Sequence, residues 1–234
     1  MHNYKIGIIG AMAPEVAILH DRMNVESETE KAGMKFWQGT IGTKDIVLVQ
    51  SGIGKVNAAV CAQILIDCFE VTHILNTGIA GSLNDALNIG DIVISTDAVL
   101  HDFDITAFGY AKGEVPGIGS ASFRADETFR AKAVEAAKAA APDIQVFEGR
   151  IVTGDQFISS QARKEAIIAD FGGMCTEMEG GAIAQTAWIN HIPFVIIRAI
   201  SDNANDTAHR DYAEIEAEAA AHSAAITARI LELM

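Results

Sequence analysis

Short apolar runs alternate with amphipathic segments along most of the chain. The first run, residues 5–10, is rich in Ile, and Pro14 behind it suits the first turn of a helix. The same alternation continues to the C-terminus. It predicts strands over residues 5–10, 34–41, 45–51, 73–77, 91–99, 146–153 and 194–200, and helices over residues 14–22, 55–69, 126–140, 160–170, 179–190 and 211–233.

Strands that alternate with helices are typical of an α/β fold. We expect a single domain over residues 1–234, with a central mixed, mostly parallel β-sheet flanked by helices on both faces. In the helix predicted over residues 55–69, apolar side chains recur at a spacing of four, so their face is expected to be buried. These side chains are Val56, Val60, Ile64 and Cys68.

In such a sheet, ligands bind beyond the carboxyl ends of the strands. Glu15 comes shortly after the first strand, Phe157 follows the strand at 146–153, and Asp202 follows the strand at 194–200. Glu179 ends a short segment in which apolar residues are followed by Glu177, Met178 and Glu179. Acidic, small and a few large apolar side chains therefore converge on one edge of the sheet, with few cations among them.

Composition and charge narrow the class of protein. The net charge of −14 argues against binding nucleic acid or an anionic membrane through the overall field, and no apolar run is long enough to span a bilayer. Cys61, Cys68 and Cys175 show no Cys-x-x-Cys spacing, so we expect buried free thiols rather than disulfides or a zinc site. The N-terminal apolar run reads as a strand rather than a secretory signal, and a cytoplasmic protein is expected.

Two stretches come near known ligand motifs. Residues 52–57 (GIGKVN) follow a strand and open a helix, but they lack the third glycine of the dinucleotide fingerprint and the Ser or Thr of a phosphate loop. We interpret these glycines as a tight strand-to-helix turn. Residues 101–104 (HDFD) include metal-ligand types without support elsewhere in the chain, so a polar loop is favoured. Neither a metal nor a cofactor is predicted.

Three segments in combination resemble one family: residues 7–15 (GIIGAMAPE), 176–184 (TEMEGGAIA) and 198–202 (RAISD). Together they resemble the 5′-methylthioadenosine/S-adenosylhomocysteine nucleosidases of the nucleoside phosphorylase superfamily. Further matches occur in the family's order over nearly the whole chain, at residues 51–55, 76–78, 88–91, 104–110 and 154–158. The resemblance implies hydrolysis of an N-glycosidic bond, which releases adenine and a 5-substituted ribose in methionine salvage and in recycling of S-adenosylmethionine by-products.

The chemistry of this reaction explains a need for acids. Adenine leaves poorly unless its ring is protonated, and the ribose gains positive charge as the bond breaks. The resemblance makes Asp202 the acid toward adenine N7, which requires a carboxyl pKa well above the ordinary ~3.9. It assigns the attacking water to Glu15 and the ribose hydroxyls to Glu179. Glu177 would point the other way in an extended segment, so we leave it out of catalysis.

The resemblance also implies a substrate cleft that a second subunit completes at its apolar end. The segment that would reach the partner is rich in Gly and apolar residues, which suits an interface better than water, so we expect a homodimer. The predicted contacts are Phe157 and Ile158 for adenine, Met178 for the ribose, Met12, Ile53 and Tyr212 for the 5′ substituent, Ala11, Ile79 and Ser201 along the cleft, and Ile105, Phe108 and Pro116 from the partner subunit.

Phosphorylases of the same superfamily use phosphate in place of water. A phosphate site needs Arg or a cluster of backbone donors, yet residues 10–15 contain no Arg, and Asn76 stands where those phosphorylases place one. Arg198 lies near the strand ends, but the hydrolases share it. Water is therefore the predicted nucleophile. The chain departs from the hydrolases at Ile79, where a Ser is common, and at residues 13–14, where acids often stand.

The first hypothesis is thus a homodimeric nucleosidase for 5′-methylthioadenosine and S-adenosylhomocysteine. 5′-Deoxyadenosine and 6-amino-6-deoxyfutalosine are close variants, because they share the adenine and the ribose. The alternatives are a purine nucleoside phosphorylase and a non-catalytic nucleoside-binding sensor. Glu15, Glu179 and Asp202 argue against the sensor, since binding alone needs no water-activating acid.

Overall fold

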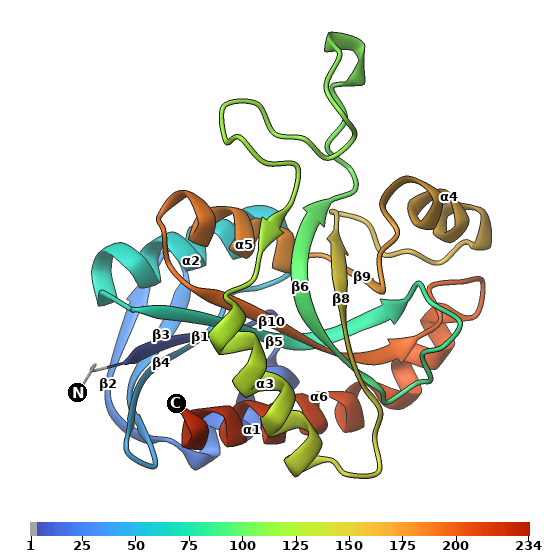
Figure 1. The fold of residues 1–234 in the computed structure, drawn as a ribbon. Coiled ribbons are helices and arrows are strands. Elements are labelled where there is room, and N and C mark those ends of the chain that lie inside the picture. Colours follow the sequence, from blue (N-terminus) through green and yellow to red (C-terminus); the bar gives the residue numbers. More distant parts are fainter. Residues whose placement is uncertain (1–3) are drawn as a thin grey trace.

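A computed structural model shows one mixed β-sheet with helices on both faces (Figure 1). It describes residues 4–234, apart from the side chains of residues 210–214, 216 and 217. The strands are β1 (Lys5–Gly10), β2 (Asn24–Lys31), β3 (Met34–Ile41), β4 (Lys44–Gln50), β5 (His73–Ser82), β6 (Ile92–Leu100), β7 (Phe123–Arg124), β8 (Val146–Thr153), β9 (Cys175–Glu177) and β10 (Phe194–Asp202). The helices are α1 (Ala13–Arg22), α2 (Lys55–Phe69), the 3₁₀ turn η1 (Thr106–Phe108), α3 (Glu127–Ala140), α4 (Gln161–Phe171), α5 (Gly180–Ile189) and α6 (Ala208–Leu233).

Parallel pairing builds the middle of the sheet. β1 lies between β4 and β5 and is parallel to both, and β10 is parallel to β5. β3 and β2 extend the sheet beyond β4 as antiparallel strands. On the other side, β5, β10, β6, β8 and β9 pair in a closed ring with antiparallel joints at β10–β6 and β5–β9. The predicted mixed sheet is confirmed, and the ring brings the carboxyl ends of β5, β8, β9 and β10 together.

Each face of the sheet has its own helices and its own core. α2 and α5 cover one face, and α1, α3 and α6 cover the other (Figure 1). Leu65 of α2 and Ile183 of α5 belong to the first core. Leu19 of α1, Phe129 of α3 and Ile226 of α6 belong to the second. Because both faces are covered, the continuous apolar runs of β1 and β10 are buried.

Several features differ from the sequence prediction, among them β2 and the exposed face of α2. β2 carries the polar sequence NVESETEK and is almost entirely exposed, so pairing with β3 rather than an apolar pattern makes it an edge strand. α2 has the predicted bounds, but the predicted buried face is wrong. Val56 is 75% exposed and Cys68 is also exposed, whereas Ala58, Cys61 and Leu65 face the core. The helix therefore carries two apolar faces, and this chain covers one of them.

The cysteines are free, as expected, but only two of them are buried. Burial raises the pKa of the Cys61 and Cys175 thiols, which keeps them protonated and unreactive. Cys68 lies on the exposed side of α2. Within residues 4–234, no described helix combines the length and the apolar character needed to cross a bilayer.

Candidate active site

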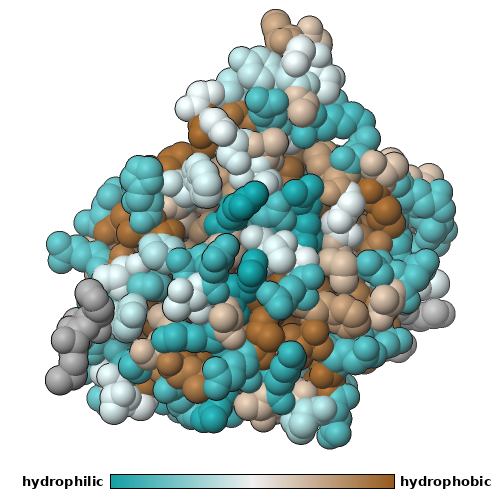
Figure 2. All heavy atoms as spheres, in the orientation of Figure 1, coloured by the Kyte–Doolittle hydropathy of each residue, from teal (hydrophilic) through white to brown (hydrophobic). Residues whose placement is uncertain are grey.

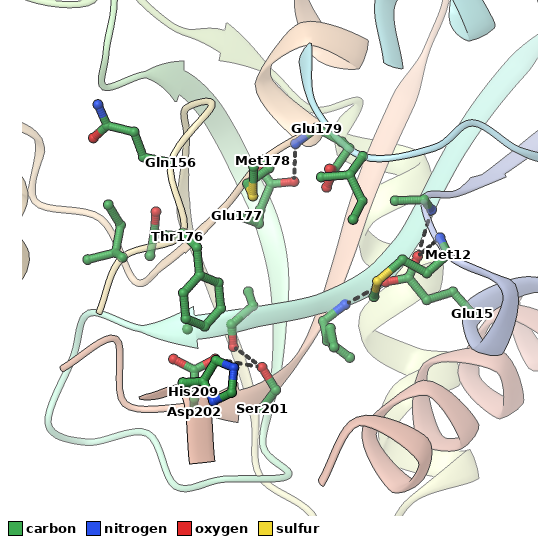
Figure 3. A pocket seen from close by; sticks show the side chains of 17 residues that line it. Met12, Glu15, Gln156, Thr176, Glu177, Met178, Glu179, Ser201, Asp202 and His209 are labelled. Carbon is green, nitrogen blue, oxygen red and sulfur yellow. Dashed lines mark hydrogen bonds between the residues drawn. The ribbon is translucent and has the colours of Figure 1, made fainter. Parts of the chain in front are cut away.

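A cavity of about 280 Å³ opens where the carboxyl ends of the strands meet (Figure 3). This volume is close to the lower end of the range of ~300–1,000 Å³ for small-molecule sites. Its wall is formed by the loops after β1, β4, β8 and β9, by the ends of β5, β9 and β10, and by the first turns of α1 and α6. The lining residues are Ala11, Met12, Glu15, Ile53, Ile79, Ala80, Gly81, Gln156, Phe157, Ile158, Thr176, Glu177, Met178, Glu179, Ser201, Asp202 and His209.

Glu15 lies in the first turn of α1, just after the chain leaves β1. Its carboxylate accepts hydrogen bonds from the backbone N–H groups of Ala11 at 2.6 Å, Met12 at 2.9 Å and Ile79 at 3.3 Å. Burial raises the pKa of this carboxyl, and the charge of Arg198 and the three hydrogen bonds offset the rise only in part. A raised pKa makes Glu15 a better proton acceptor than an exposed glutamate.

Gly78, in the middle of β5, lies between the Glu15 carboxylate and the Arg198 guanidinium. A Cβ atom at Gly78 would collide with Nη1 of Arg198 and would lie 2.7 Å from Oε1 of Glu15. The absence of a side chain lets the guanidinium and the carboxylate approach each other across the strand.

Glu179 lies between β9 and α5, on another side of the cavity (Figure 3). Its carboxylate accepts a hydrogen bond from the N–H of Gly54 at 2.8 Å and lies 4.0 Å from the guanidinium of Arg198. Burial and the neighbouring Glu177 carboxylate raise the pKa of Glu179 to about 7, although Arg198 and Gly54 act in the opposite direction. The charge of Glu15 adds to the rise.

Arg198 is fully buried behind these glutamates. Its guanidinium donates hydrogen bonds to the amide oxygen of Asn76 at 2.6 Å and to the carboxylate of Glu177. The Glu177 carboxylate also accepts the N–H groups of Glu179 at 3.1 Å and Gly180 at 2.6 Å, at the start of α5. Glu177 therefore borders the cavity while its carboxylate fixes α5 and Arg198.

Asp202 ends β10, where the register of the strand shifts. The hydroxyl of Ser201 donates to one carboxyl oxygen at 2.8 Å, and the N–H of Ala204 donates to the other at 2.8 Å. Gly81 on β5 leaves room for this carboxyl, because a Cβ atom there would lie 2.8 Å from Oδ1 of Asp202. The carboxyl is buried and lies across the cavity from Glu15 (Figure 3).

Most of the predicted site residues meet in this one cavity. Besides the three acids, its wall includes Ala11, Met12, Ile53, Ile79, Phe157, Ile158, Met178 and Ser201. The predicted partner contacts Ile105, Phe108 and Pro116 lie instead in the segment between β6 and β7, which projects from the body (Figure 1). Tyr212 belongs to the part of α6 whose side chains fall outside the described residues.

Sequence reasoning missed several residues of the wall. Gln156 immediately precedes Phe157 in a stretch that matches the family, and that position was a usable signal. His209 lies in the first turn of α6, which begins at Ala208, before the predicted start at residue 211. Glu177 was set aside because side chains alternate in an extended segment. The other missed residues are Ala80, Gly81 and Thr176, which are small. Thr176 begins the matching segment at residues 176–184, so its position was also a usable signal.

The acids of the 101–104 stretch are engaged outside the cavity. Asp102 pairs with Lys55 at 2.5 Å, and Asp104 accepts the N–H of Thr106 at 2.9 Å. Across the part of the chain that the structure describes, no three His, Cys, Asp or Glu side chains gather into a set that could hold a metal ion.

The buried position of Arg198 leads to a stability prediction. Arg198→Met would leave the Glu177 carboxylate buried without its cation, so we expect the free energy of unfolding to fall by about 3–5 kcal/mol. Urea denaturation measures the change. Arg130→Met is the matched control, because Arg130 pairs with Glu148 at 3.0 Å near the surface, where a pair contributes roughly 0–1 kcal/mol. Equal losses in the two variants would contradict the prediction.

Comparisons with known proteins support a common family. The sequence model of the phosphorylase superfamily matches residues 5–232. The 5′-methylthioadenosine/S-adenosylhomocysteine nucleosidase of Geobacillus sp. (strain WCH70) is 45% identical over 228 residues, which cover 97% of this chain and 97% of that protein. The nucleosidase of the same name from Staphylococcus haemolyticus (strain JCSC1435) is 42% identical over 230 residues, with 98% and 100% covered.

Solved structures agree with the sequence relatives. A 5′-methylthioadenosine/S-adenosylhomocysteine nucleosidase from Colwellia psychrerythraea 34H, in complex with adenine, is 40% identical with a TM-score of 0.95, and the match covers 99% of this chain and 96% of that one. Futalosine hydrolase of Helicobacter pylori strain 26695 is 32% identical with a TM-score of 0.94 and 99% of each chain covered. The chain therefore belongs to the phosphorylase superfamily and, within it, to the 5′-methylthioadenosine/S-adenosylhomocysteine nucleosidases, which are N-glycosyl hydrolases.

Proposed function

We propose that this protein hydrolyses the N-glycosidic bond of 5′-methylthioadenosine and S-adenosylhomocysteine, releasing adenine and the 5-substituted ribose. One observation carries the proposal: Glu15, Glu179 and Asp202, from distant parts of the chain, line a single cavity that Phe157 also borders. The names of the relatives and the adenine bound in the Colwellia structure support the same substrate class.

In this mechanism Asp202 protonates adenine at N7 while the bond between N9 and ribose C1′ breaks. The electron pair of that bond passes into the adenine ring, so the added proton makes adenine a neutral leaving group. Ser201 and Ala204 hold the Asp202 carboxyl at the end of β10. Phe157 offers a flat apolar face on which adenine can stack, and Ile158 offers backbone groups to the edge of the base.

Glu15 activates the water that attacks C1′. The water oxygen forms the new bond to C1′, and one water proton passes to the Glu15 carboxylate. The N–H groups of Ala11 and Met12 fix the orientation of that carboxylate at the start of α1. Its burial raises its pKa, which increases its affinity for the proton at the moment of attack.

Glu179 binds the ribose hydroxyls, and Met178 packs against the ribose. The ribose gains positive charge in the transition state, whereas the substrate is neutral at this position. Carboxylates fixed in advance along the cavity wall therefore stabilise the transition state more than the substrate. Arg198, behind the wall, keeps these carboxylates together without contributing to the lining.

The charges of the cavity favour water over phosphate. Arg and Lys are missing from the described residues that line it, while Glu15, Glu177, Glu179 and Asp202 are among them. Arg198 is fully buried and already pairs with Asn76 and Glu177. A phosphate anion would therefore meet carboxylates instead of the Arg groups that bind phosphate in proteins.

We also propose that a second copy of the chain completes the 5′ end of the cavity. The segment between β6 and β7 projects from the body with apolar atoms at its tip (Figure 2), and Phe108 near that tip is 80% exposed. Val56 on α2 and Ile53 at the cavity are exposed as well. Apolar surface of this kind is stabilised when a partner covers it. The residues that would reach the other cavity are Ile105, Phe108 and Pro116 of the partner subunit.

A futalosine-type nucleoside is a second candidate substrate. The likeness to futalosine hydrolase of Helicobacter pylori, with a TM-score of 0.94, supports it. 6-Amino-6-deoxyfutalosine, like 5′-deoxyadenosine, shares adenine and ribose with 5′-methylthioadenosine and differs in the 5′ substituent. The exposed side chain of Ile53 borders the region that would receive that substituent.

The product of the reaction separates the candidate functions. Incubation with 5′-methylthioadenosine is expected to give adenine and free methylthioribose both with and without phosphate, because the cavity favours water. Chromatography with mass detection identifies the sugar. A sugar 1-phosphate that forms only with phosphate would instead establish a phosphorylase, and micromolar adenosine binding without any product would establish a sensor.

Asp202→Asn is expected to lower kcat for adenine release by about 10²–10⁴-fold, since the amide cannot supply the proton. Circular dichroism and thermal unfolding check that the variant folds. Asp206→Asn, an exposed acid in the same loop, is the matched control and should retain wild-type kcat. Wild-type turnover by Asp202→Asn would remove Asp202 from the mechanism.

The pKa of Glu179, about 7, and the raised pKa of Glu15 predict a loss of activity in acid. Both groups act as carboxylates, so each gains a proton and loses its charge as the pH falls through its pKa. The profile of kcat/KM against pH should therefore have an acid limb. Below it, kcat/KM should fall by about tenfold per pH unit if the binding of one proton inactivates the enzyme. A profile that stays flat as the pH falls well below 7 would contradict the roles given to these two groups.

A further inference from the structure

Three charged side chains form a cluster just outside the cavity, at the base of the projecting segment. Nζ of Lys55 lies 2.5 Å from Oδ1 of Asp102 and 3.9 Å from Oδ2 of Asp155. The N–H of Asp155 donates to Asp102 at 2.9 Å, and the N–H of Lys55 donates to Asp155 at 2.8 Å. We call Lys55, Asp102 and Asp155 the rim cluster; none of the three is among the residues that line the cavity.

The rim cluster connects to Glu179 through the start of α2. Gly54 immediately precedes Lys55, and its N–H donates to the Glu179 carboxylate at 2.8 Å. Gly54 provides no side-chain cap for the helix, and the Asp155 carboxylate accepts the first helical N–H in its place. Gly54 also has a φ of 96°, and a Cβ atom there would lie 3.2 Å from Asp155. Asp155 therefore holds the backbone N–H that directly follows the Gly54 N–H in the chain.

The same cluster holds the loop that carries the predicted adenine platform. Asp155 is followed directly by Gln156 and Phe157, which line the cavity. One residue earlier, Gly154 packs against the ring of His101, and a Cβ atom on Gly154 would collide with that ring. His101 and Asp102, directly after β6, therefore hold Gly154 and Asp155, directly after β8.

The charges of the cluster are partly shielded from water. The side chains of Lys55 and Asp102 are 22% and 15% exposed, so their attraction is screened less than that of a fully exposed pair. Burial acts to raise the pKa of Asp102, but the Lys55 ammonium and the Asp155 N–H outweigh it and lower the pKa. Asp102 therefore stays ionised at neutral pH.

We propose that Lys55, Asp102 and Asp155 are positioning residues, which set Glu179 and the Phe157 loop in place for the reaction. This inference rests on the proposed hydrolysis and deepens it. The rim cluster acts on the ribose side through Gly54 and on the adenine side through the loop after β8. Asp102 also stands at the base of the segment that would reach the partner, so the contact between copies and the chain's own cavity share one set of ion pairs.

A pair of substitutions at Lys55 tests the proposal. Lys55→Met keeps most of the apolar length of the side chain but leaves the carboxylates of Asp102 and Asp155 without their cation. Small displacements of catalytic groups are costly. We expect kcat/KM for 5′-methylthioadenosine to fall by about tenfold or more. Lys55→Arg restores the positive charge and should recover most of that loss. Adenine release at saturating and at low substrate gives kcat and kcat/KM separately.

The pH profile separates positioning from a general loss of folded protein. The Gly54 N–H lowers the pKa of Glu179, so a displaced Gly54 should move the acid limb of kcat/KM to higher pH in Lys55→Met. The other charged groups that face Glu179, namely Glu177, Arg198 and Glu15, are unchanged in this variant. A smaller folded fraction alone would lower activity without moving the limb.

Asp102→Asn is the second variant. The same fall in kcat/KM and the same move of the acid limb to higher pH are expected, and this variant tests the proposal if Lys55→Met does not fold. Glu148→Gln, which breaks the Arg130–Glu148 pair away from the cavity, should match wild type. Unchanged kcat/KM in the cluster variants, a loss without a moved limb, or an equal loss in Glu148→Gln would overturn the inference alone. Wild-type protein that releases no adenine would overturn the proposed function and the inference with it.

Discussion

The site depends on one buried cation, the guanidinium of Arg198. A buried charge without partners is strongly destabilising, and a set of neighbouring buried carboxylates would either repel one another or take up protons. Here the two problems offset each other, since Arg198 pairs with Glu177, lies 4.0 Å from Glu179 and approaches Glu15 across Gly78. Its positive charge lies behind the wall while the carboxylates border the cavity. The arrangement therefore exposes negative charge to a ligand without leaving that charge uncompensated in the fold.

Much of the site follows from general rules of chain topology. Glu15 and Asp202 come just after buried strands, and ligands of such sheets bind at the carboxyl ends, so both acids could be placed from the sequence. The pairing of Arg198 with Glu177 could not, because it joins residues whose approach depends on how β9 and β10 meet within the ring. The ring closes through β9, which has only three residues and no apolar pattern from which a strand could be predicted. β2 escaped prediction for a related reason, since only its pairing with β3 makes it a strand.

The error on α2 is informative in a different way. The spacing of Val56 and its apolar neighbours predicts a buried face, and in the single chain that face is exposed. An apolar pattern indicates a face that is buried from water. It does not distinguish burial within the chain from burial against a second copy. The second apolar face of α2 therefore supports the proposal that another copy of the chain covers it. The same helix begins at Lys55, in the rim cluster, and Gly54 before it contacts Glu179. The proposed surface for a partner therefore lies on the helix whose preceding residue binds Glu179.

The sign of the charge around the cavity links the choice of nucleophile to the stabilisation of the transition state. At an effective dielectric constant of ~20, two unit charges ~4 Å apart interact by about 4 kcal/mol. Even with Glu179 partly protonated near neutral pH, a phosphate dianion beside Glu15 would meet repulsion of this order, and water would meet none. In the proposed mechanism, the same carboxylates attract a ribose that becomes cationic as adenine leaves. The carboxylates that repel phosphate would therefore also lower the barrier for attack by water. The same charges would select hydrolysis over phosphorolysis without any further group.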